Sequence, residues 1–374
     1  MTSEAIPIYT GQDFYVPSFQ VKLQERPLGK DVIYDITQVS YTDNIESVDS
    51  FELTVNNWDA EKRAFKYSDT DLFIPGKKVE LWMGYYGRDR LRLMIVGKIT
   101  SLRPTFPASG QSTLAVSGQN LLHSLRGKQV SRRYENLTAS QIARQIGQRM
   151  RIRVRTDPNA EAREERYTYR LQQNEYDIVF LMKLAEQHGY DLFVEERGQN
   201  GQAEQSTLYF GPPVHRKVVY ALNYGSSLID FQPNLSTSDQ VGAVQFNDWD
   251  SENKRPIRYT AQRDQLTTQP VSPAAGKRDI EESFRDRNEI ITHRPVRSQQ
   301  EGQTLATETH ERVARQMLTG SGATVGLPDL RAGGYVQITG VGTRYSGRYF
   351  VTSTTHTIGN SGYTTSFEAR REHS

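Results

Sequence analysis

Two stretches near opposite ends of the chain share one β pattern, and this repeat constrains the fold more than any other feature. A strand entered through glycine and then alternating in polarity occurs at 76–81, as Gly-Lys-Lys-Val-Glu-Leu, and again at 333–338, as Gly-Gly-Tyr-Val-Gln-Ile. A second glycine opens a second strand in each half, at 97–99 and at 347–349. Because the side chains of a strand alternate between its two faces, each run predicts a half-buried strand. The repeat therefore predicts two similar small antiparallel β-barrels in one chain.

The first half of the chain, residues 19–126, is typical of a compact antiparallel unit. Turn residues separate short apolar-polar runs, and no helical period occurs between them. Closely spaced short strands without helices favour a small barrel, and we expect the first tube-like barrel here. The residues before it, 1–18, contain Pro7, Gly11 and Pro17 and are expected to form an extended arm. The expected strands are 19–23, 32–39, 51–55, 78–83, 91–102 and 112–117.

Residues 127–215 carry helix signals that the first barrel lacks. Thr138 opens a capping-box pattern followed by an apolar helical period, which predicts a helix ending near Arg151. A second helix is expected to start at Asn174 and to end before Gly189, a residue suited to a left-handed C-cap. These signals predict an α/β domain with two helices. Two alternating runs in the same region, 190–194 and 207–210, indicate a hairpin.

The last part of the chain returns to β structure. Residues 226–250 read as two half-buried strands with a turn between them, and we assign 216–254 together with 320–374 to the second barrel. Residues 255–295 are polar and show no sustained apolar period, so we expect a partly mobile excursion that ends in a helix and spans 255–319 in all. The helix is expected at 301–318, where Leu305, Thr309, Val313 and Met317 recur every four positions.

Composition excludes several classes of protein. The absence of cysteine from all 374 residues excludes disulfides, thiolate catalysis and cysteine zinc sites. A total of 46 Lys and Arg against 44 Asp and Glu gives a net charge of +2, far from the positive excess of a dedicated nucleic-acid binder. No apolar run approaches the roughly 18 residues that a membrane span needs, and the N-terminus shows no secretory signal. We therefore expect protein partners and assembly in a reducing cytoplasm.

No cluster of residues predicts catalysis, a cofactor or a metal site. The seven histidines are scattered, and His310 with Glu311 lacks the second histidine of a zinc-protease helix. Acidic runs at 161–165 and 279–286 could form carboxylate pairs or cation sites, but basic residues interleave with them, so we interpret them as solvated ion pairs. The basic run at 119–133 could bind phosphate, but a polar linker is the simpler interpretation.

Five aromatic residues are candidates for subunit contacts. Large rigid side chains dominate the energetics of interfaces, but they also fill the cores of small barrels. Both interpretations stay open for the set, and for one member, Trp249, we favour the core. The five are Tyr85, Tyr86, Trp249, Tyr345 and Tyr349.

Three fragments resemble the late control gene D family of contractile phages, and also the hub portion of type VI secretion spike proteins. They are P-G-K-K-V-E-L-W-M-G-Y from Pro75, N-E-Y-D-I-V-F-L-M-K-L-A-E-Q-H-G-Y-D-L-F-V from Asn174 and Y-S-G-R-Y-F-V-T-S-T-T-H-T-I from Tyr345. The likeness spans about residues 19–371. It implies a homotrimeric baseplate hub whose barrels cap the hexameric tail tube, with a spike on the opposite side. With two barrels per chain, a trimer presents six similar units around one axis.

The resemblance also sets the expected partners. The chain stops at Ser374, soon after the second barrel, so we expect the spike to be a separate trimeric polypeptide. The other expected partners are further copies of the chain, a hexameric inner tube protein and other baseplate proteins of a phage tail or a phage-tail-like particle. Two alternatives stay open. One is a tail-associated cell-wall hydrolase that uses carboxylates such as Glu164 or Glu282, and the other is a glycan- or receptor-binding β protein, suggested by the tyrosine-rich terminal strands.

Overall fold

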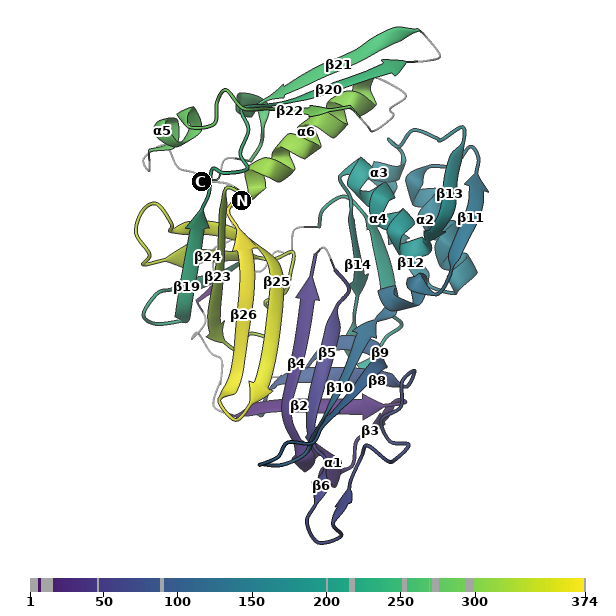
Figure 1. The fold of residues 1–374 in the computed structure, drawn as a ribbon, viewed down its shortest axis with the longest axis vertical. Helices are drawn as coiled ribbons and strands as arrows, with labels where there is room; N and C mark the ends of the chain where they lie inside the picture. Colours follow the sequence, from purple (N-terminus) through teal and green to yellow (C-terminus); the bar gives the residue numbers. More distant parts are fainter. Residues whose placement is uncertain are drawn as a thin grey trace.

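A computed structural model describes residues 6–7, 16–45, 47–87, 91–199, 201–214, 219–250, 254–268, 270, 276–292 and 299–372. The architecture is mainly β, with two small barrels, an α/β unit and a smaller sheet packed on a helix (Figure 1). The predicted fold class is therefore confirmed. The expected arm lies largely outside the described residues, apart from its strand β1 (Ile6–Pro7), which pairs in parallel with β18 (Val219–Asn223).

The N-terminal barrel is one bent antiparallel sheet around a single apolar core. In sheet order its strands are β4 (Ile36–Asn44), β5 (Ser50–Asn56), β10 (Thr113–Asn120), β9 (Arg92–Thr105), β8 (Lys78–Tyr85) and β2 (Pro17–Leu23). Figure 1 shows β2 and β8 crossing behind β4, β5 and β10. Alternation decides which residues are inside: on β5, Phe51, Leu53 and Val55 are buried, whereas the residues between them are not.

A short helix and three short strands flank this barrel, and the helix shows that one predicted strand was wrong at its start. The strand expected at 32–39 begins only at Ile36, because the residues before it form the helix α1 (Lys30–Asp35). Val32 and Ile33 still pack against the barrel core, but from a helix. The remaining short strands are β3 (Arg26–Pro27), β6 (Trp58–Asp59) and β7 (Ala64–Phe65).

The C-terminal barrel has the same strand order. Its strands are β19 (Leu228–Leu235), β23 (Leu318–Val325), β26 (Gly362–Arg370), β25 (Gly347–Gly359) and β24 (Tyr335–Thr339), with β18 beside β24. All neighbours are antiparallel except β18 and β24, which are parallel, whereas the corresponding β2 is antiparallel to β8. Leu222, Val336, Tyr349 and Phe367 lie in its core.

The two barrels repeat each other down to their bulges. The β9–β10 ladder skips Thr100 and the β25–β26 ladder skips Thr352. Each of these threonine hydroxyls donates to the carbonyl opposite, on Ser117 at 3.5 Å and on Glu368 at 3.1 Å. A second shared bulge lies at residue 37 of β4 and at residue 229 of β19. Bulges interrupt a ladder at defined places, so two matching bulges fix the residue-by-residue correspondence of the barrels.

The glycine entries predicted from the sequence occupy equivalent places. Gly76 donates to the Ile99 carbonyl at 2.7 Å, and Gly333 donates to the Val351 carbonyl at 2.8 Å. Both glycines have positive φ, +94° and +81°, a conformation that other residues rarely adopt. The predicted match of Gly97 with Gly347 was wrong by two residues. Gly97 lies opposite Val79 of β8, and the residue in the equivalent place of the C-terminal barrel is Tyr349, which lies opposite Val336 of β24.

Strand β25 joins the two barrels. Its first half pairs with β24, and on the same edge its second half, 353–358, pairs with residues 39–44 of β4. The join creates one antiparallel sheet in the order β19-β23-β26-β25-β4-β5-β10-β9. In the part of the chain that the structure describes, no strand pairs with the outer edge of β19 or with the outer edge of β9 beyond Ile99.

The α/β unit follows β10 and contains both predicted helices, although the second begins at Asp177 and not at the predicted Asn174, which lies in a strand. Thr138 and Gln141 form the capping box, and Gly189 ends the second helix with φ +63°. The run at 119–133 is not a linker: it holds the end of β10, a 3₁₀ turn and a strand. The elements are η1 (Leu121–Arg126), β11 (Gln129–Tyr134), α2 (Ala139–Met150), β12 (Arg153–Thr156), α3 (Pro158–Glu161), β13 (Arg170–Tyr176), α4 (Asp177–His188), β14 (Asp191–Glu195), β15 (Gly198–Gln199), β16 (Gln202–Ala203) and β17 (Thr207–Gly211). The predicted hairpin is the antiparallel pair β14–β17.

The polar excursion contains more structure than the sequence indicated. Its elements are β21 (Arg255–Gln262), η2 (Arg263–Gln265), α5 (Lys277–Glu282), β22 (Asn288–Ile291) and α6 (Gln299–Arg315), and β20 (Ala243–Asp250) lies just before it. Strand β20, which we had assigned to the second barrel, instead forms a three-stranded sheet with β21 and β22, and α6 packs along it (Figure 1). The helix buries Ala306 and His310, and of the predicted stripe Thr309 is also buried while Leu305 packs at the edge of the core. Residues 269, 271–275 and 293–298 of the excursion lie outside the described residues.

Candidate functional site

One face of the long joined sheet carries almost only small polar side chains. Each strand buries one set of alternating residues in a barrel core and turns the other set to this face. On β4, Val39 and Tyr41 are fully buried while Ser40 and Thr42 are not, and the Thr42 hydroxyl lies 3.0 Å from that of Thr355 across the join. We call this surface the polar sheet face. From β19 to β9 its residues are Asp230, Gln232, Asn234, Thr319, Ser321, Ala323, Val325, Thr364, Ser366, Glu368, Arg370, Ser353, Thr355, Thr357, Gln38, Ser40, Thr42, Asn44, Ser50, Glu52, Thr54, Ala115, Ser117, Gln119, Lys98, Ser101, Arg103 and Thr105.

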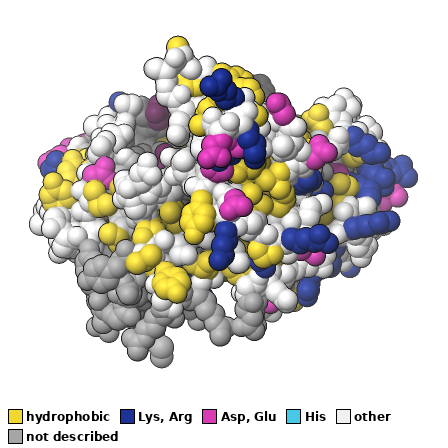
Figure 2. All heavy atoms as spheres, turned by 90° about the horizontal axis from the view of Figure 1, so that it is seen from below, with side chains coloured by type: hydrophobic (Ala, Val, Ile, Leu, Met, Phe, Trp, Pro, Cys, Tyr) yellow, Lys and Arg dark blue, Asp and Glu magenta, His cyan; other side chains and the backbone are white. Residues whose placement is uncertain are grey.

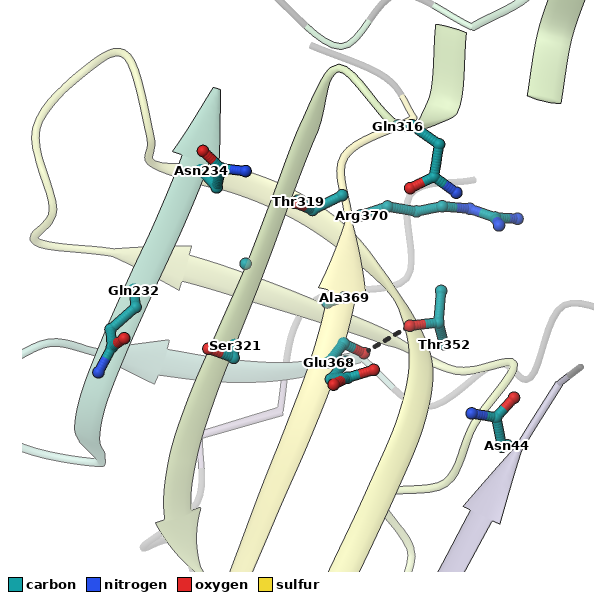
Figure 3. Close-up of a pocket in the computed structure, with 11 residues that line it drawn as sticks. Asn44, Gln232, Asn234, Gln316, Thr319, Ser321, Thr352, Glu368, Ala369 and Arg370 are labelled. Atoms are coloured by element: carbon teal, nitrogen blue, oxygen red, sulfur yellow. Dashed lines mark hydrogen bonds between the residues drawn. The ribbon is translucent and has the colours of Figure 1, made fainter. Parts of the chain in front are cut away.

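The polar sheet face is hollowed where the C-terminal barrel approaches the join. One hollow has a volume of ≈ 420 Å³ and reaches from β19 to Asn44 of β4, and a neighbouring one has ≈ 310 Å³. Figure 3 shows Gln232 on β19, Ser321 on β23 and Glu368 on β26, with the Thr352 hydroxyl bonded to the Glu368 residue. The hollows are therefore floored by strands and lined by hydroxyl, amide and carboxylate groups.

Charges on this face are few and partly paired. Arg103 lies 3.3 Å from Glu52, which also accepts a hydrogen bond from the Ser117 hydroxyl at 2.9 Å. Within the described ranges, no group of three or more His, Asp or Glu residues is arranged to hold a metal ion. Hydroxyl and amide groups make up most of the face, with carboxylates at Asp230, Glu52 and Glu368, guanidinium groups at Arg103 and Arg370 and the ammonium group of Lys98 among them.

The acidic residues considered for catalysis are engaged elsewhere. Glu161 forms an ion pair with Arg144, which lowers the pKa of that carboxyl. Glu164 accepts from the Ser140 backbone N–H at 2.9 Å and from the Tyr190 hydroxyl at 3.0 Å. In the second acidic run, Glu282 lies 3.8 Å from Arg278 and 3.5 Å from Arg285. For Glu161 and Glu282 the ion-pair interpretation is confirmed.

The five candidate aromatics separate into three environments. Tyr85 and Tyr349 are buried, and their hydroxyls donate to the carbonyls of Gly326 at 2.9 Å and Tyr345 at 2.7 Å. Tyr345 itself is partly buried against the C-terminal core. Tyr86 is 75% exposed. The structure does not bring the five together into one site.

Trp249 is 57% exposed, so the core interpretation was wrong for this residue. On β20 the even-numbered Val244 and Phe246 face α6 and form the core of that unit. Trp249 alternates with them and stands on the opposite face, opposite Pro256 of β21. The alternation was visible in the sequence, but the side of the sheet that the helix covers was not.

A buried charge pair lies behind the join, and no pattern in the sequence indicated it. Arg331, from the loop before β24, donates from Nε to Oδ2 of Asp43 at 2.8 Å and from Nη2 to the Met94 carbonyl at 2.9 Å. Its guanidinium also lies 4.5 Å from the centre of the Tyr41 ring. Asp43 accepts a further hydrogen bond from the Thr354 hydroxyl on β25. The pair thus connects three segments that are distant in the sequence and belong to both barrels.

Two titratable groups beside this pair have shifted pKa values. His356 is fully buried, with Nε2 3.0 Å from the Leu330 carbonyl and Nδ1 3.0 Å from the Tyr363 hydroxyl. Burial and the nearby Arg331 lower the pKa of His356 to about 3, so the imidazole is neutral at physiological pH. Burial, followed by the repulsion from Asp43, raises the pKa of Asp49 to about 7. The join therefore contains groups that respond to pH.

Solved structures of tail proteins share this fold over nearly their whole length. The 43 kDa tail protein of prophage MuSo2 from Shewanella oneidensis aligns with a TM-score of 0.70 at 15% identity, over 95% of this chain and 98% of that one. A tail protein from Neisseria meningitidis MC58 aligns with a TM-score of 0.65 at 13% identity, over 96% and 97%. The E. coli c3393 protein, described as a component of the type VI secretion system, aligns with a TM-score of 0.59 at 12% identity, over 95% and 77%. The chain has the fold of phage tail and type VI secretion proteins.

The sequence comparisons are sparser. No curated protein matches the chain. Among the described residues, none of the helices has the length and apolar character needed to cross a membrane. One family model, that of the Alg8 N-terminal domain, matches residues 16–360, from the first strand of the N-terminal barrel to the end of β25. Since this match covers most of the 374 residues, the chain belongs to the Alg8 N-terminal domain family.

Proposed function

We propose that the chain is the structural hub of a contractile tail or of a related contractile injection system. The observation that carries the proposal is the bulge-by-bulge repeat of the two barrels. In a homotrimer this repeat places six similar barrels around one axis, so a threefold assembly matches a sixfold tube. The fold shared with phage tail proteins supports the same role.

In this proposal the polar sheet face lines the bore of the ring. The face spans both barrels, is hollowed, and carries Ser, Thr, Asn and Gln at most positions. Lining a channel with such groups keeps it hydrated and avoids the exposed apolar surface that causes adhesion. The two barrel cores then face away from the bore, with the α/β unit beside the N-terminal barrel (Figure 1).

The partners in this proposal are proteins at the two ends of the ring. A hexameric inner tube protein meets one end, a spike protein meets the other, and further baseplate proteins contact the periphery. The end of the molecule seen in Figure 2 carries hydrophobic side chains among charged ones, with Lys and Arg gathered toward the right. Tyr34 is 82% exposed and Ile74 is 37% exposed in the N-terminal barrel. Such side chains suit a protein contact.

The domain division and the place of assembly belong to the same proposal. The N-terminal barrel spans 19–126 and the α/β domain spans 127–215, while the C-terminal barrel is interrupted by the β20–α6 insertion. The chain assembles in the bacterial cytoplasm and functions in the baseplate of the particle. A catalytic role is not favoured, because the carboxylates considered for a hydrolase are hydrogen-bonded or ion-paired within the protein. No observation favours a glycan-binding role.

The proposal is tested by the mass and symmetry of the purified protein. Light scattering after size exclusion should give the mass of three chains, and averaged electron-microscope images should show a ring with six density lobes and a central opening. Adding the tube protein should produce end-capped tubes. A protein that stays monomeric at every concentration, with and without its tube protein, contradicts the proposal.

A further inference from the structure

We infer that the two edges of the long sheet with which no described strand pairs join one copy of the chain to the next, with the register that joins β25 to β4 inside the chain. This inference rests on the proposed ring and names the strands and residues that close it. The second half of β9 forms one edge and β19 forms the other, and they lie at opposite ends of the sheet order. A surface that ends in two unpaired edges pairs readily with another strand, and here the partner is a second copy.

The internal repeat identifies the partner strands. Strand β9 corresponds to β25, because Thr100 and Thr352 occupy the same bulge with the same hydroxyl-to-carbonyl bond. Strand β19 corresponds to β4 through their shared bulge at residues 229 and 37. Inside the chain, β25 pairs with β4. By the same rule, β9 of one copy pairs with β19 of the next, so the contact is head-to-tail and closes a ring.

The correspondence also sets the register. Thr355 lies opposite Thr42 in the internal join. Counted from the shared bulges, Thr355 corresponds to Arg103 and Thr42 corresponds to Asn234, so Arg103 of one copy lies opposite Asn234 of the next. Both residues are exposed in the single chain, and both belong to the polar sheet face. The face therefore continues from one copy to the next without a change in character.

The join between copies differs from the internal one at its centre. In the internal join, Ile45 donates to the Thr352 carbonyl at 3.0 Å, and hydrogen-bonded pairs alternate along an antiparallel ladder. Every second pair of this ladder is therefore hydrogen-bonded. Tyr41 and His356 lie four positions along the ladder from Ile45 and Thr352, so they also form a hydrogen-bonded pair. The corresponding residues on the two outer edges are Pro233 and Pro104, neither of which has a backbone N–H.

The prolines disfavour unspecific pairing of other strands with these two edges. Each proline nitrogen faces the outer edge, where it disturbs no bond to the strand on its other side. Proline on an edge strand blocks unspecific pairing. The join between copies consequently lacks two donors that the internal join has, so the ring dissociates more easily than the two barrels of one chain separate.

Paired cysteines test the register on a clean background, because the chain has no cysteine of its own. Antiparallel residues in a non-hydrogen-bonded pair have Cα atoms about 4.5 Å apart, within the range that a disulfide spans. The variant Arg103→Cys with Asn234→Cys should form covalent trimers on a non-reducing gel after mild oxidation. As the matched internal control, Thr42→Cys with Thr355→Cys should form a disulfide within one chain and stay a monomer on the same gel.

A register control makes the result specific. Asp230 lies on the same strand and face as Asn234 but four residues away, roughly 13 Å along the strand. Arg103→Cys with Asp230→Cys should therefore cross-link at least tenfold less. Equal cross-linking of both variants overturns the register. A protein with trimer mass and sixfold images but no Arg103–Asn234 cross-link overturns the inference and leaves the proposed ring standing, whereas a protein that is monomeric throughout overturns both.

Discussion

Replacing Arg331 with methionine tests whether the buried charge pair holds the two barrels together. The side chains of Arg331 and Asp43 are 16% and 6% exposed, so solvent screens their interaction little. Methionine fills a similar volume but leaves the Asp43 carboxylate without its cation. Removing one partner of a buried ion pair costs about 3–5 kcal/mol, because the remaining charge is buried without compensation. We expect Arg331→Met to lower the free energy of unfolding by about that amount.

Urea unfolding followed by tryptophan fluorescence and by circular dichroism measures the effect. Arg92→Met is the matched control, because Arg92 reaches the same loop through Asp329, at 3.2 Å, but with 62% of its side chain exposed. Exposed pairs contribute about 0–1 kcal/mol, so this variant should unfold close to wild type. The double variant Asp43→Asn with Arg331→Met should lose less stability than Arg331→Met alone, since no buried charge is left unpaired.

Two results would refute this reasoning. One is an Arg331→Met protein that unfolds within about 1 kcal/mol of wild type, because the buried pair would then behave like a surface pair. The other is a double variant whose loss of stability equals the sum of the losses in Arg331→Met and Asp43→Asn, each measured alone, because additivity means that the two residues do not interact. Hydrogen exchange of the amides in residues 39–44 provides an independent reading, since these amides should lose protection first when the join loosens.

Further predictions concern pH dependence and local packing. Asp49 has a pKa raised to about 7 from an ordinary 3.8, so the folded protein binds this proton more tightly than the unfolded chain does. The free energy of unfolding should therefore fall as the pH rises from about 4 to 7. Urea titrations across this range should show no such fall for Asp49→Asn. The pKa of His356, lowered to about 3 from 6.5, has the opposite effect, and the free energy of unfolding should fall as the pH drops from about 6.5 to 3. This fall should be less steep in His356→Gln than in the wild-type protein. Thr138→Ala should cost about 1 kcal/mol in thermal unfolding and Thr138→Ser much less, because serine keeps the cap. Gly118→Ala should destabilise by about 1–3 kcal/mol, because a Cβ there would lie 2.4 Å from both the Lys98 carbonyl oxygen and the Phe51 ring. An unchanged melting temperature would show that the neighbouring strand and the ring both shift to make room.

Local elements followed from the sequence because local interactions determine them. The capping box at Thr138 and the left-handed position of Gly189 depend on neighbouring residues only, and both helices formed where those residues predicted. The alternating runs and the repeated glycine entries predicted both barrels, because the period of two fixes which residues face a core. The expected strand at 32–39 failed at its start, since Val32 and Ile33 reach the core equally well from a helix.

Only the tertiary structure decided which edges and faces meet. The residues of β20 do not indicate that β21 and β22 flank this strand, nor that α6 covers the face opposite Trp249. The pairing of β25 with β4 and the burial of Arg331 against Asp43 likewise bring together segments roughly 300 residues apart. The period of a strand tells which of its side chains share a face, but the partner of an edge depends on which other edge lies within hydrogen-bonding distance once both barrels have formed.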